Sequence, residues 1–322
     1  MPERTPRQTG KVAVILAMYN GVQYIEEQLD SLLSQTRTID RVIIGDDGSN
    51  DGSMEVVIKY ISKHNLQNTW KLFVNGNNKG HAGNFINLCK LINEDYVFFS
   101  DQDDIWMPDK IQSMLKIMEE NQYIQMLCAE FINFSSKENL DFQIKNDQYT
   151  YTIECVQFSP QNYFFHSLGC SSCVRGNFIR EILPYWTKAW EHDMFFWACA
   201  ILQNNAYRYN APVIYRRLHE SNASRMEKKY LSKRIEQCQS SIQRPKNMIE
   251  LLHRENIVEK SKLRFLKRYK LTLKIRIRML CHRNPLWGFW LLFFCSDCYL
   301  HKEKGVLLDI YLCLFKTFPR KQ

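Results

Sequence analysis

A regular alternation of strand-like and helix-like patterns fills the first third of the sequence. Continuous apolar runs occur at residues 12–17, 42–45 and 96–99, a further strand-like run interrupted by Lys71 occurs at 70–74, and apolar residues at helical spacing follow each of the first three runs along the chain. After the fourth run, Pro108 suits the first turn of a further helix. Strands that alternate with helices through short connections are typical of an open parallel sheet covered on both faces. The sequence therefore predicts an α/β fold.

Two acidic turns follow the second and the fourth of these expected strands. Because the carboxyl ends of parallel strands share one edge of a sheet, we expect both turns to border one crevice. Neighbouring carboxylates repel one another unless a cation neutralises them, and their oxygens suit Mg²⁺ or Mn²⁺, which share ligands with substrate phosphates. The alternative is a pair of solvated turns that lead into helices. The acidic residues are Asp46 and Asp47 in the first turn and Asp101, Asp103 and Asp104 in the second.

The absence of two phosphate-binding motifs narrows the chemistry. No GxGxxG follows the first strand and no GxxxxGK[ST] occurs, which argues against a nicotinamide cofactor and against a P-loop nucleotidase. A metal that neutralises a leaving diphosphate indicates group transfer from an activated donor. Such a reaction needs a base, and Asp193, beside His192 at the start of an apolar helix, is a candidate. Its alternative role is that of a first-turn acid in that helix.

The charge of the chain is unevenly distributed. The 322 residues carry a net charge of +9, and residues 225–283 hold 18 Lys or Arg against 5 Glu. We expect three segments: a disordered N-terminus at 1–10, a catalytic domain at 11–225, and a basic, mainly helical region at 226–322. The first ten residues are polar, which argues against export and for a cytoplasmic protein.

The basic region also carries apolar residues at helical spacing. A basic amphipathic helix suits an anionic membrane surface, and aromatic residues suit its interface. The alternative is a basic helical subdomain packed on the catalytic body. Nucleic-acid binding is not expected, since no recognised module is present. The stripe consists of Leu266, Tyr269, Leu273 and Ile277, and the aromatic cluster of Trp287 and Trp290.

Short motifs in a fixed order carry a family resemblance. They are Ala17–Asn20, Gln35–Thr36, Asp46–Ser49, Asn78 and Gly80 with Asn84 and Phe85, Asp101–Trp106, His192–Asp193, and Arg217 and His219 with Asn222, Ala223 and Ser224. Each is weak alone, but together the chain resembles family 2 glycosyltransferases of the GT-A fold, and most of all their bacterial rhamnosyltransferase-like members. The resemblance implies a Rossmann-like, mixed and mainly parallel sheet flanked by helices, followed by the basic helical extension.

The resemblance also implies roles for individual residues. Tyr19 would stack on the nucleotide base and Asp47 would accept a hydrogen bond from it. Asp193 would take the proton of the acceptor hydroxyl as that oxygen attacks the anomeric carbon with inversion. The implied metal ligands for Mn²⁺ or Mg²⁺ are Asp103, Asp101 and His219, the last with a loop histidine as its alternative. The implied nucleotide-sugar-binding residues are Ala17, Tyr19, Asp47, Asn78, Gly80, Asp101, Gln102 and Asp103.

The implied activity is transfer of a sugar from a nucleotide-sugar donor to a hydroxyl of a cell-surface polysaccharide or glycolipid. The donor would be dTDP-rhamnose or a UDP-sugar, and the enzyme would work as a peripheral protein on the inner face of the cell membrane. One departure concerns Met194 and Phe195, which stand where the family often has Trp and leave the acceptor open. The rival hypotheses are an inactive nucleotide-sugar-binding or membrane-adaptor protein, and a nucleotidyltransferase.

Overall fold

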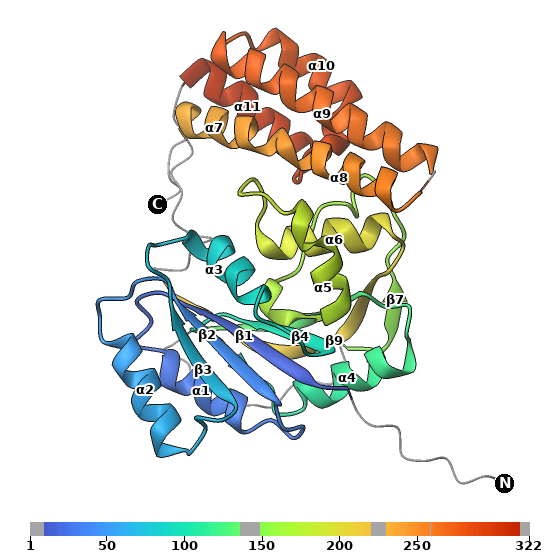
Figure 1. Cartoon of the computed structure of the whole chain (residues 1–322). Helices are drawn as coiled ribbons and strands as arrows, with labels where there is room; N and C mark the ends of the chain where they lie inside the picture. The colour runs from blue at the N-terminus through green and yellow to red at the C-terminus, as the bar shows by residue number, and fades with distance from the viewer. Residues whose placement is uncertain (1–9, 136–148, 220–229, 258, 316–322) are drawn as a thin grey trace, which may run out of the picture. The chain divides into compact units, whose positions relative to one another are not determined.

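The computed structural model describes residues 10–135, 149–219, 230–257 and 259–315. The chain divides into two compact units (Figure 1). The first, the sheet unit, runs to Val156 and adds His166–Pro184 and Asn205–His219; the second, the helical unit, holds the rest. The segment at 1–10, expected to be disordered, lies outside the described residues except for Gly10, and the expected boundary at 225/226 lies outside them as well.

One mixed sheet forms the centre of the sheet unit. Its strands lie in the order β3-β2-β1-β4-β8-β6-β9-β5, and β7 pairs with β9. The first four strands are parallel to their neighbours, as their buried apolar runs predict, whereas β8 pairs antiparallel with β4 and extends the sheet. The strands are β1 (Val12–Met18), β2 (Arg41–Asp46), β3 (Trp70–Val74), β4 (Tyr96–Ser100), β5 (Ile105–Trp106), β6 (Met126–Ser135), β7 (Ile153–Cys155), β8 (Ser172–Arg175) and β9 (Ala206–Leu218).

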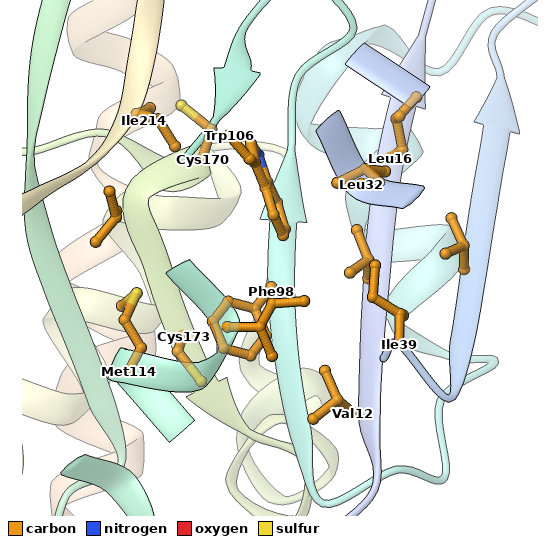
Figure 2. Packing of buried hydrophobic residues seen from close by; sticks show 14 of the residues in the cluster. Val12, Leu16, Leu32, Ile39, Phe98, Trp106, Met114, Cys170, Cys173 and Ile214 are labelled. Atoms are coloured by element: carbon orange, nitrogen blue, oxygen red, sulfur yellow. The ribbon is translucent and has the colours of Figure 1, made fainter. Parts of the chain in front are cut away.

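Helices cover both faces of this sheet. On one face, Val12 and Leu16 of β1 and Phe98 of β4 pack in one cluster with Leu32 of α1 and Met114 of α4 (Figure 2). Residues of α2 join the same cluster, and α3 packs on the opposite face. The prediction of an α/β sheet flanked by helices is therefore confirmed. The helices of this unit are α1 (Ile25–Leu33), α2 (Ser53–Lys63), α3 (Gly80–Cys89), α4 (Lys110–Glu120) and α5 (Gly176–Ile182).

The absence of a side chain at Gly45 lets α3 approach β2 closely. A Cβ atom at Gly45 would lie 2.4 Å from Oδ1 of Asn84 and 2.8 Å from Cδ1 of Leu88. Asn84 uses this proximity to donate a hydrogen bond of 2.7 Å from Nδ2 to the Gly45 carbonyl. The glycine therefore lets the second half of α3 lie beside the carboxyl end of β2.

The helical unit contains the expected basic helical region. Its stripe at Leu266, Tyr269 and Leu273 is buried inside the unit, so the expectation that this face of α9 meets a membrane is wrong.

Asp309 of α11 is buried and pairs with Arg234 of α7 (2.6 Å) and Arg276 of α9 (2.8 Å). The helices are α6 (His192–Leu202), α7 (Leu231–Ser241), α8 (Gln243–Arg254), α9 (Lys260–Cys281), α10 (Leu286–Phe294) and α11 (Lys302–Phe315). Among the described helices, none is both long and apolar enough to cross a bilayer.

Candidate active site

The two acidic turns lie at the same edge of the sheet. In the parallel ladders on either side of β1, Leu16 is level with Ile44 of β2 and with Ser100 of β4. The chain therefore leaves β2 and β4 at neighbouring positions. Gln102, in the turn after β4, accepts a hydrogen bond at Oε1 from the Tyr19 amide (2.8 Å) and donates from Nε2 to the Tyr19 carbonyl (3.0 Å). The turn after β4 is thus joined directly to the turn after β1.

Two of the three carboxylates in the Asp101–Asp104 turn contact a histidine. Nε2 of His219 lies 2.8 Å from Oδ2 of Asp103, and Nε2 of His81 lies 3.0 Å from Oδ1 of Asp101. His219 follows β9 and also stacks on Tyr24, with ring centroids 4.8 Å apart. Of the three residues proposed as metal ligands, Asp103 and His219 are in direct contact, whereas Asp101 contacts His81.

Arg217, near the end of β9, forms hydrogen bonds with the acidic turn. Its side chain is buried, its Nε donates to the Asp103 carbonyl (3.0 Å), and its amide donates to Oδ1 of Asp104 (3.2 Å). Its guanidinium also forms an ion pair with Glu27 of α1. These contacts fix the backbone of the turn that carries the carboxylates.

The turn carries more negative charge than its surroundings stabilise. Burial and the nearby charge of Asp101 raise the pKa of Asp103 above its ordinary value, an effect that His219 opposes. Burial and the charges of Asp101 and Asp103 raise the pKa of Asp104 to about 7. A divalent cation would relieve this repulsion, and carboxylate oxygens with an imidazole are suitable ligands for Mn²⁺. The residues present therefore fit such an ion.

A second possible ligand set overlaps the first. Within the described ranges, ligand atoms of Asp101, Asp104 and Cys170 all lie within 4.8 Å of one another. Burial, followed by the charges of Asp104 and Asp101, raises the pKa of the Cys170 thiol well above its ordinary value, and this thiol hydrogen-bonds to Asp104. A protonated thiol is a poor ligand for Mg²⁺ or Mn²⁺. We therefore assign Cys170 to positioning Asp104, a contact that no sequence pattern indicated.

The turn after β2 contributes a second group of polar contacts at this edge of the sheet. Asp47 is buried, and its Oδ1 accepts hydrogen bonds from Nδ2 of Asn75 (2.9 Å) and from the Lys79 amide (2.8 Å). Asn78 donates from Nδ2 to the Asp47 carbonyl (3.2 Å) and accepts from the Gly80 amide (2.9 Å). Gly80 has φ +72°, a conformation that glycine adopts readily. Asn75 was missed in the sequence, although it follows β3 at the same edge.

Two other predicted donor-site residues differ in exposure. Ala17 is buried within β1, so it can offer only backbone to a ligand, whereas the Tyr19 side chain is 50% exposed at the strand end.

The helical unit holds Asp193, the second residue of α6, whose Oδ1 accepts a hydrogen bond from the Met194 amide (2.7 Å). This contact is that of a first-turn acid, and the catalytic role of Asp193 stays a prediction. The family motif at 222–224 lies outside the described residues.

Curated relatives of the chain are glycosyltransferases by name. It is 30% identical to the dTDP-rhamnosyl transferase RfbG of Shigella flexneri over 226 residues, which cover 64% of this chain and 72% of that protein. It is 27% identical to the putative glycosyltransferase EpsE of Bacillus subtilis over 124 residues, which cover 38% of this chain and 44% of the relative.

Solved structures share the fold. TarS 1-349 of S. aureus, in complex with UDP-GlcNAc, matches with a TM-score of 0.58 at 18% identity, over 94% of this chain and 89% of TarS 1-349. The mannosyltransferase PcManGT of Pyrobaculum calidifontis, in complex with GDP-Man and Mn²⁺, matches with a TM-score of 0.54 at 16% identity, over 96% and 88% of the two chains. The GT-A fold that the resemblance implied is thus confirmed. The sequence profile described as "Glycosyl transferase family 2" matches residues 13–180, and with it the acidic turns of the sheet unit, so this chain belongs to glycosyltransferase family 2.

Proposed function

We propose that the chain moves a sugar from a nucleotide-sugar donor to an acceptor hydroxyl, with inversion and with the help of a divalent cation. The observation that carries this proposal is the contact between Asp103 and His219, which places an imidazole on one of the three electrostatically interacting carboxylates of the acidic turn. Membership of a glycosyltransferase family supplies the reaction class. The crevice edge supplies groups suited to a nucleoside diphosphate on one side and to a cation on the other.

The nucleotide end of the donor is assigned to the turns after β1 and β2. The half-exposed ring of Tyr19 is available for stacking on a base, a contact in which aromatic side chains are effective. Both hydrogen bonds to the Asp47 side chain use Oδ1, so Oδ2 is the atom assigned to accept a proton from the base. Asn78 and Gly80 hold Asp47 in place, and the Ala17 backbone borders the same edge.

The diphosphate end of the donor is assigned to the Asp101–Asp104 turn. Asp103, Asp101 and His219 would hold Mn²⁺ or Mg²⁺, and the bound ion supplies charge neutralisation for the departing nucleoside diphosphate. Gln102 fixes the turn against the Tyr19 backbone, and Arg217 fixes it against β9. Through these contacts Gln102 and Arg217 hold the turn in position.

Asp193 is assigned as the base. In the proposed reaction its carboxylate takes the proton of the acceptor hydroxyl while the hydroxyl oxygen bonds to the anomeric carbon. The bond from that carbon to the diphosphate oxygen breaks in the same step, which inverts the configuration. What supports this assignment is the His192–Asp193 pair at the start of an apolar helix and the family resemblance that names it.

Donor and acceptor are proposed from the named relatives. RfbG is named for dTDP-rhamnose, and TarS 1-349 was solved with UDP-GlcNAc, which together favour dTDP-rhamnose or a UDP-sugar as donor. We propose a growing cell-surface polysaccharide or a glycolipid as acceptor. The excess of Lys and Arg in the helical unit supports a place on the inner, anionic face of the cell membrane.

A donor panel tests this proposal. Thermal unfolding is followed with dTDP-rhamnose, UDP-GlcNAc and GDP-mannose, each with Mn²⁺ and with chelator, and nucleoside diphosphate release is measured in parallel. A cognate donor should raise the melting temperature only with the cation present, since a ligand stabilises the state it binds. Equal effects with and without Mn²⁺ would refute metal dependence, and no response to any nucleotide sugar would favour the inactive adaptor.

A further inference from the structure

Helix α10 exposes an unusual number of large apolar side chains. Six of its nine residues are large and apolar with between 40% and 76% of their surface exposed. Their spacing places them on one face of the helix, hereafter the α10 stripe. A contiguous apolar patch of this kind on a protein surface normally marks a contact site. The α10 stripe consists of Leu286, Trp287, Phe289, Trp290, Phe293 and Phe294.

The other face of α10 is packed, so the stripe is held in a fixed orientation. Leu291 and Gly288 are buried, and a Cβ atom at Gly288 would lie 2.2 Å from Cγ1 of Ile310 in α11. Arg283, just before α10, donates from Nε to the carbonyl of Cys313 at the other end of α11 (3.0 Å). The helix is therefore anchored along its length, and its apolar residues point outward because the inner positions are filled.

A second apolar face lies on the partner helix. In α11 the side chains of Leu307, Leu314 and Phe315 are at least half exposed. Leu307 and Leu314 are seven residues apart, two helical turns, so they lie on one side of α11. The hairpin of α10 and α11 thus presents apolar side chains from both of its helices.

Basic residues surround this hairpin. The segment from Lys260 to Phe315 contains twelve Lys or Arg and three acidic residues. One of the three acids, Asp309, is buried in its pairs with Arg234 and Arg276 and adds nothing to the surface field. The exposed charged side chains of this segment are therefore almost all cationic. They are Lys260, Arg264, Lys267, Lys274, Arg278, Arg283, Lys302 and Lys304, against Glu303 alone among the exposed acids of this segment.

We propose that the α10 stripe inserts into the headgroup region of a bilayer that contains anionic lipids. The proposal deepens the peripheral location proposed above by naming the surface, and it moves the contact from α9, whose stripe is buried, to α10. Trp and Phe on one face with Lys and Arg nearby is the composition of helices that lie in a membrane interface. The cations pair with lipid phosphates while the rings enter the acyl boundary.

Two other occupants fit less well. A second copy of the chain would bring the same basic side chains face to face, and like charges at a symmetric contact oppose association. A transmembrane position is excluded by length, because nine helical residues span about 14 Å and the hydrocarbon core is about 30 Å thick. A bilayer surface satisfies both the apolar stripe and the charge around it.

Vesicle flotation of the full chain tests the proposal. The protein is mixed with vesicles of phosphatidylcholine alone or with 30% phosphatidylglycerol, and the bound fraction is measured. The double variant Phe289→Ser/Phe293→Ser removes part of the stripe, and Ile58→Ser on α2, 53% exposed in the sheet unit, is its control. The charge variant Lys302→Gln/Lys304→Gln is matched by Lys59→Gln/Lys63→Gln on α2, whose lysines are also exposed.

We expect the wild type to bind the anionic vesicles at least about tenfold more tightly than the zwitterionic ones. The stripe variant should lose most of this binding, the charge variant should lose the preference for anionic lipid, and both controls should behave as wild type. Equal binding by the stripe variant would overturn the proposal. So would a dimer in sedimentation equilibrium that the stripe variant converts to a monomer, since the stripe would then be an interface between copies.

A measurement of donor binding distinguishes a failure of the membrane proposal from a failure of the proposed function. Every variant is also examined for its thermal shift with the cognate nucleotide sugar and Mn²⁺. A stripe variant that keeps this shift and loses vesicle binding supports the proposal. If no nucleotide sugar shifts the wild type, the flotation result still decides the membrane proposal on its own.

Discussion

Nε2 of His219 lies 2.8 Å from Oδ2 of Asp103, although 116 residues separate them in the chain. The contact follows from the antiparallel pairing of β5 with β9, which sets Ile105 opposite Tyr215. Because β5 directly follows the acidic turn, this pairing brings the end of β9 back to the turn. The cation site proposed here is therefore closed by the last strand of the sheet.

Replacing Asp103 should abolish turnover of the donor. Asp103→Ala removes the carboxylate that His219 contacts and the oxygens assigned to the cation, and release of nucleoside diphosphate should fall to about 1% of wild type or less. Glu55→Ala, which removes an exposed acid from α2, is the control and should leave the rate unchanged. Full activity of the Asp103 variant would remove the central residue from the proposed mechanism.

Replacing Asp193 should separate chemistry from binding. Asp193→Asn keeps the size of the side chain and an oxygen that can accept the Met194 amide hydrogen bond, but it cannot take a proton at neutral pH. We expect sugar transfer to fall by about 10² to 10⁴-fold while the thermal shift with nucleotide and Mn²⁺ stays close to wild type. Normal transfer would show that another group is the base, and a lost thermal shift would point to a structural role.

A methyl group at Gly45 should weaken both folding and nucleotide binding. Gly45→Ala places a carbon 2.4 Å from Oδ1 of Asn84, so α3 must move away from β2. Urea unfolding should show a loss of about 1–3 kcal/mol in the free energy of unfolding. Gly76→Ala is the matched control, since a Cβ there has no atom within 4 Å. Equal stability of the two variants would mean that α3 can move away from β2 without lowering the free energy of unfolding.

The Asp309 pairs should make the stability of the helical unit depend on acid pH. Burial opposes ionisation of Asp309, but Arg276 and Arg234 hold its pKa below the ordinary value. Its stabilising contribution is therefore present above the unfolded-state pKa of about 3.9 and is lost as the pH falls through the lower folded-state pKa. Over that window the unfolded chain binds more protons, so stability rises with pH.

Asp309→Asn should lower the free energy of unfolding at pH 7 by about 3–5 kcal/mol, because a buried arginine is left without its counter-charge. The difference from wild type should shrink as the pH falls below the unfolded-state pKa of about 3.9 and through the lower folded-state pKa, where the wild-type carboxyl becomes neutral too. Asp297→Asn breaks a more exposed pair with Arg268 and should cost about 1 kcal/mol or less. Denaturant unfolding of all three proteins across pH checks this, and a constant difference would refute the linkage.

Much of the sheet unit could be predicted because β1, β2 and β4 are buried on both faces. The run at 70–74 coincides with β3, and the two acidic turns do lie at one edge. The strand β9 is harder to recognise at its start, because Arg208 and Asn210 interrupt the apolar pattern there, close to its irregular pairing with β6. Periodicity detects buried strands well and bulged, partly polar ones poorly.

The contacts that shape the site could not be predicted. The Asn75 and Lys79 bonds to Asp47 and the Cys170 contact with Asp104 depend on which loops meet, and no local pattern encodes that. The α9 stripe shows a related limit. Its spacing indicates an apolar face but does not say whether lipid or protein covers that face, and here other helices of the unit cover it.

The side-chain amide of Gln102 forms hydrogen bonds with the Tyr19 backbone through both its oxygen and its nitrogen. Gly21 leaves space for this side chain, since a Cβ atom at Gly21 would lie 2.3 Å from Oε1 of Gln102. The proposed base site and the proposed cation site are consequently linked through this one pair of hydrogen bonds. An engineer who grafts a new base-reading loop onto this enzyme would have to carry Gly21 and Gln102 along as a pair, or the cation ligands would shift with the loop.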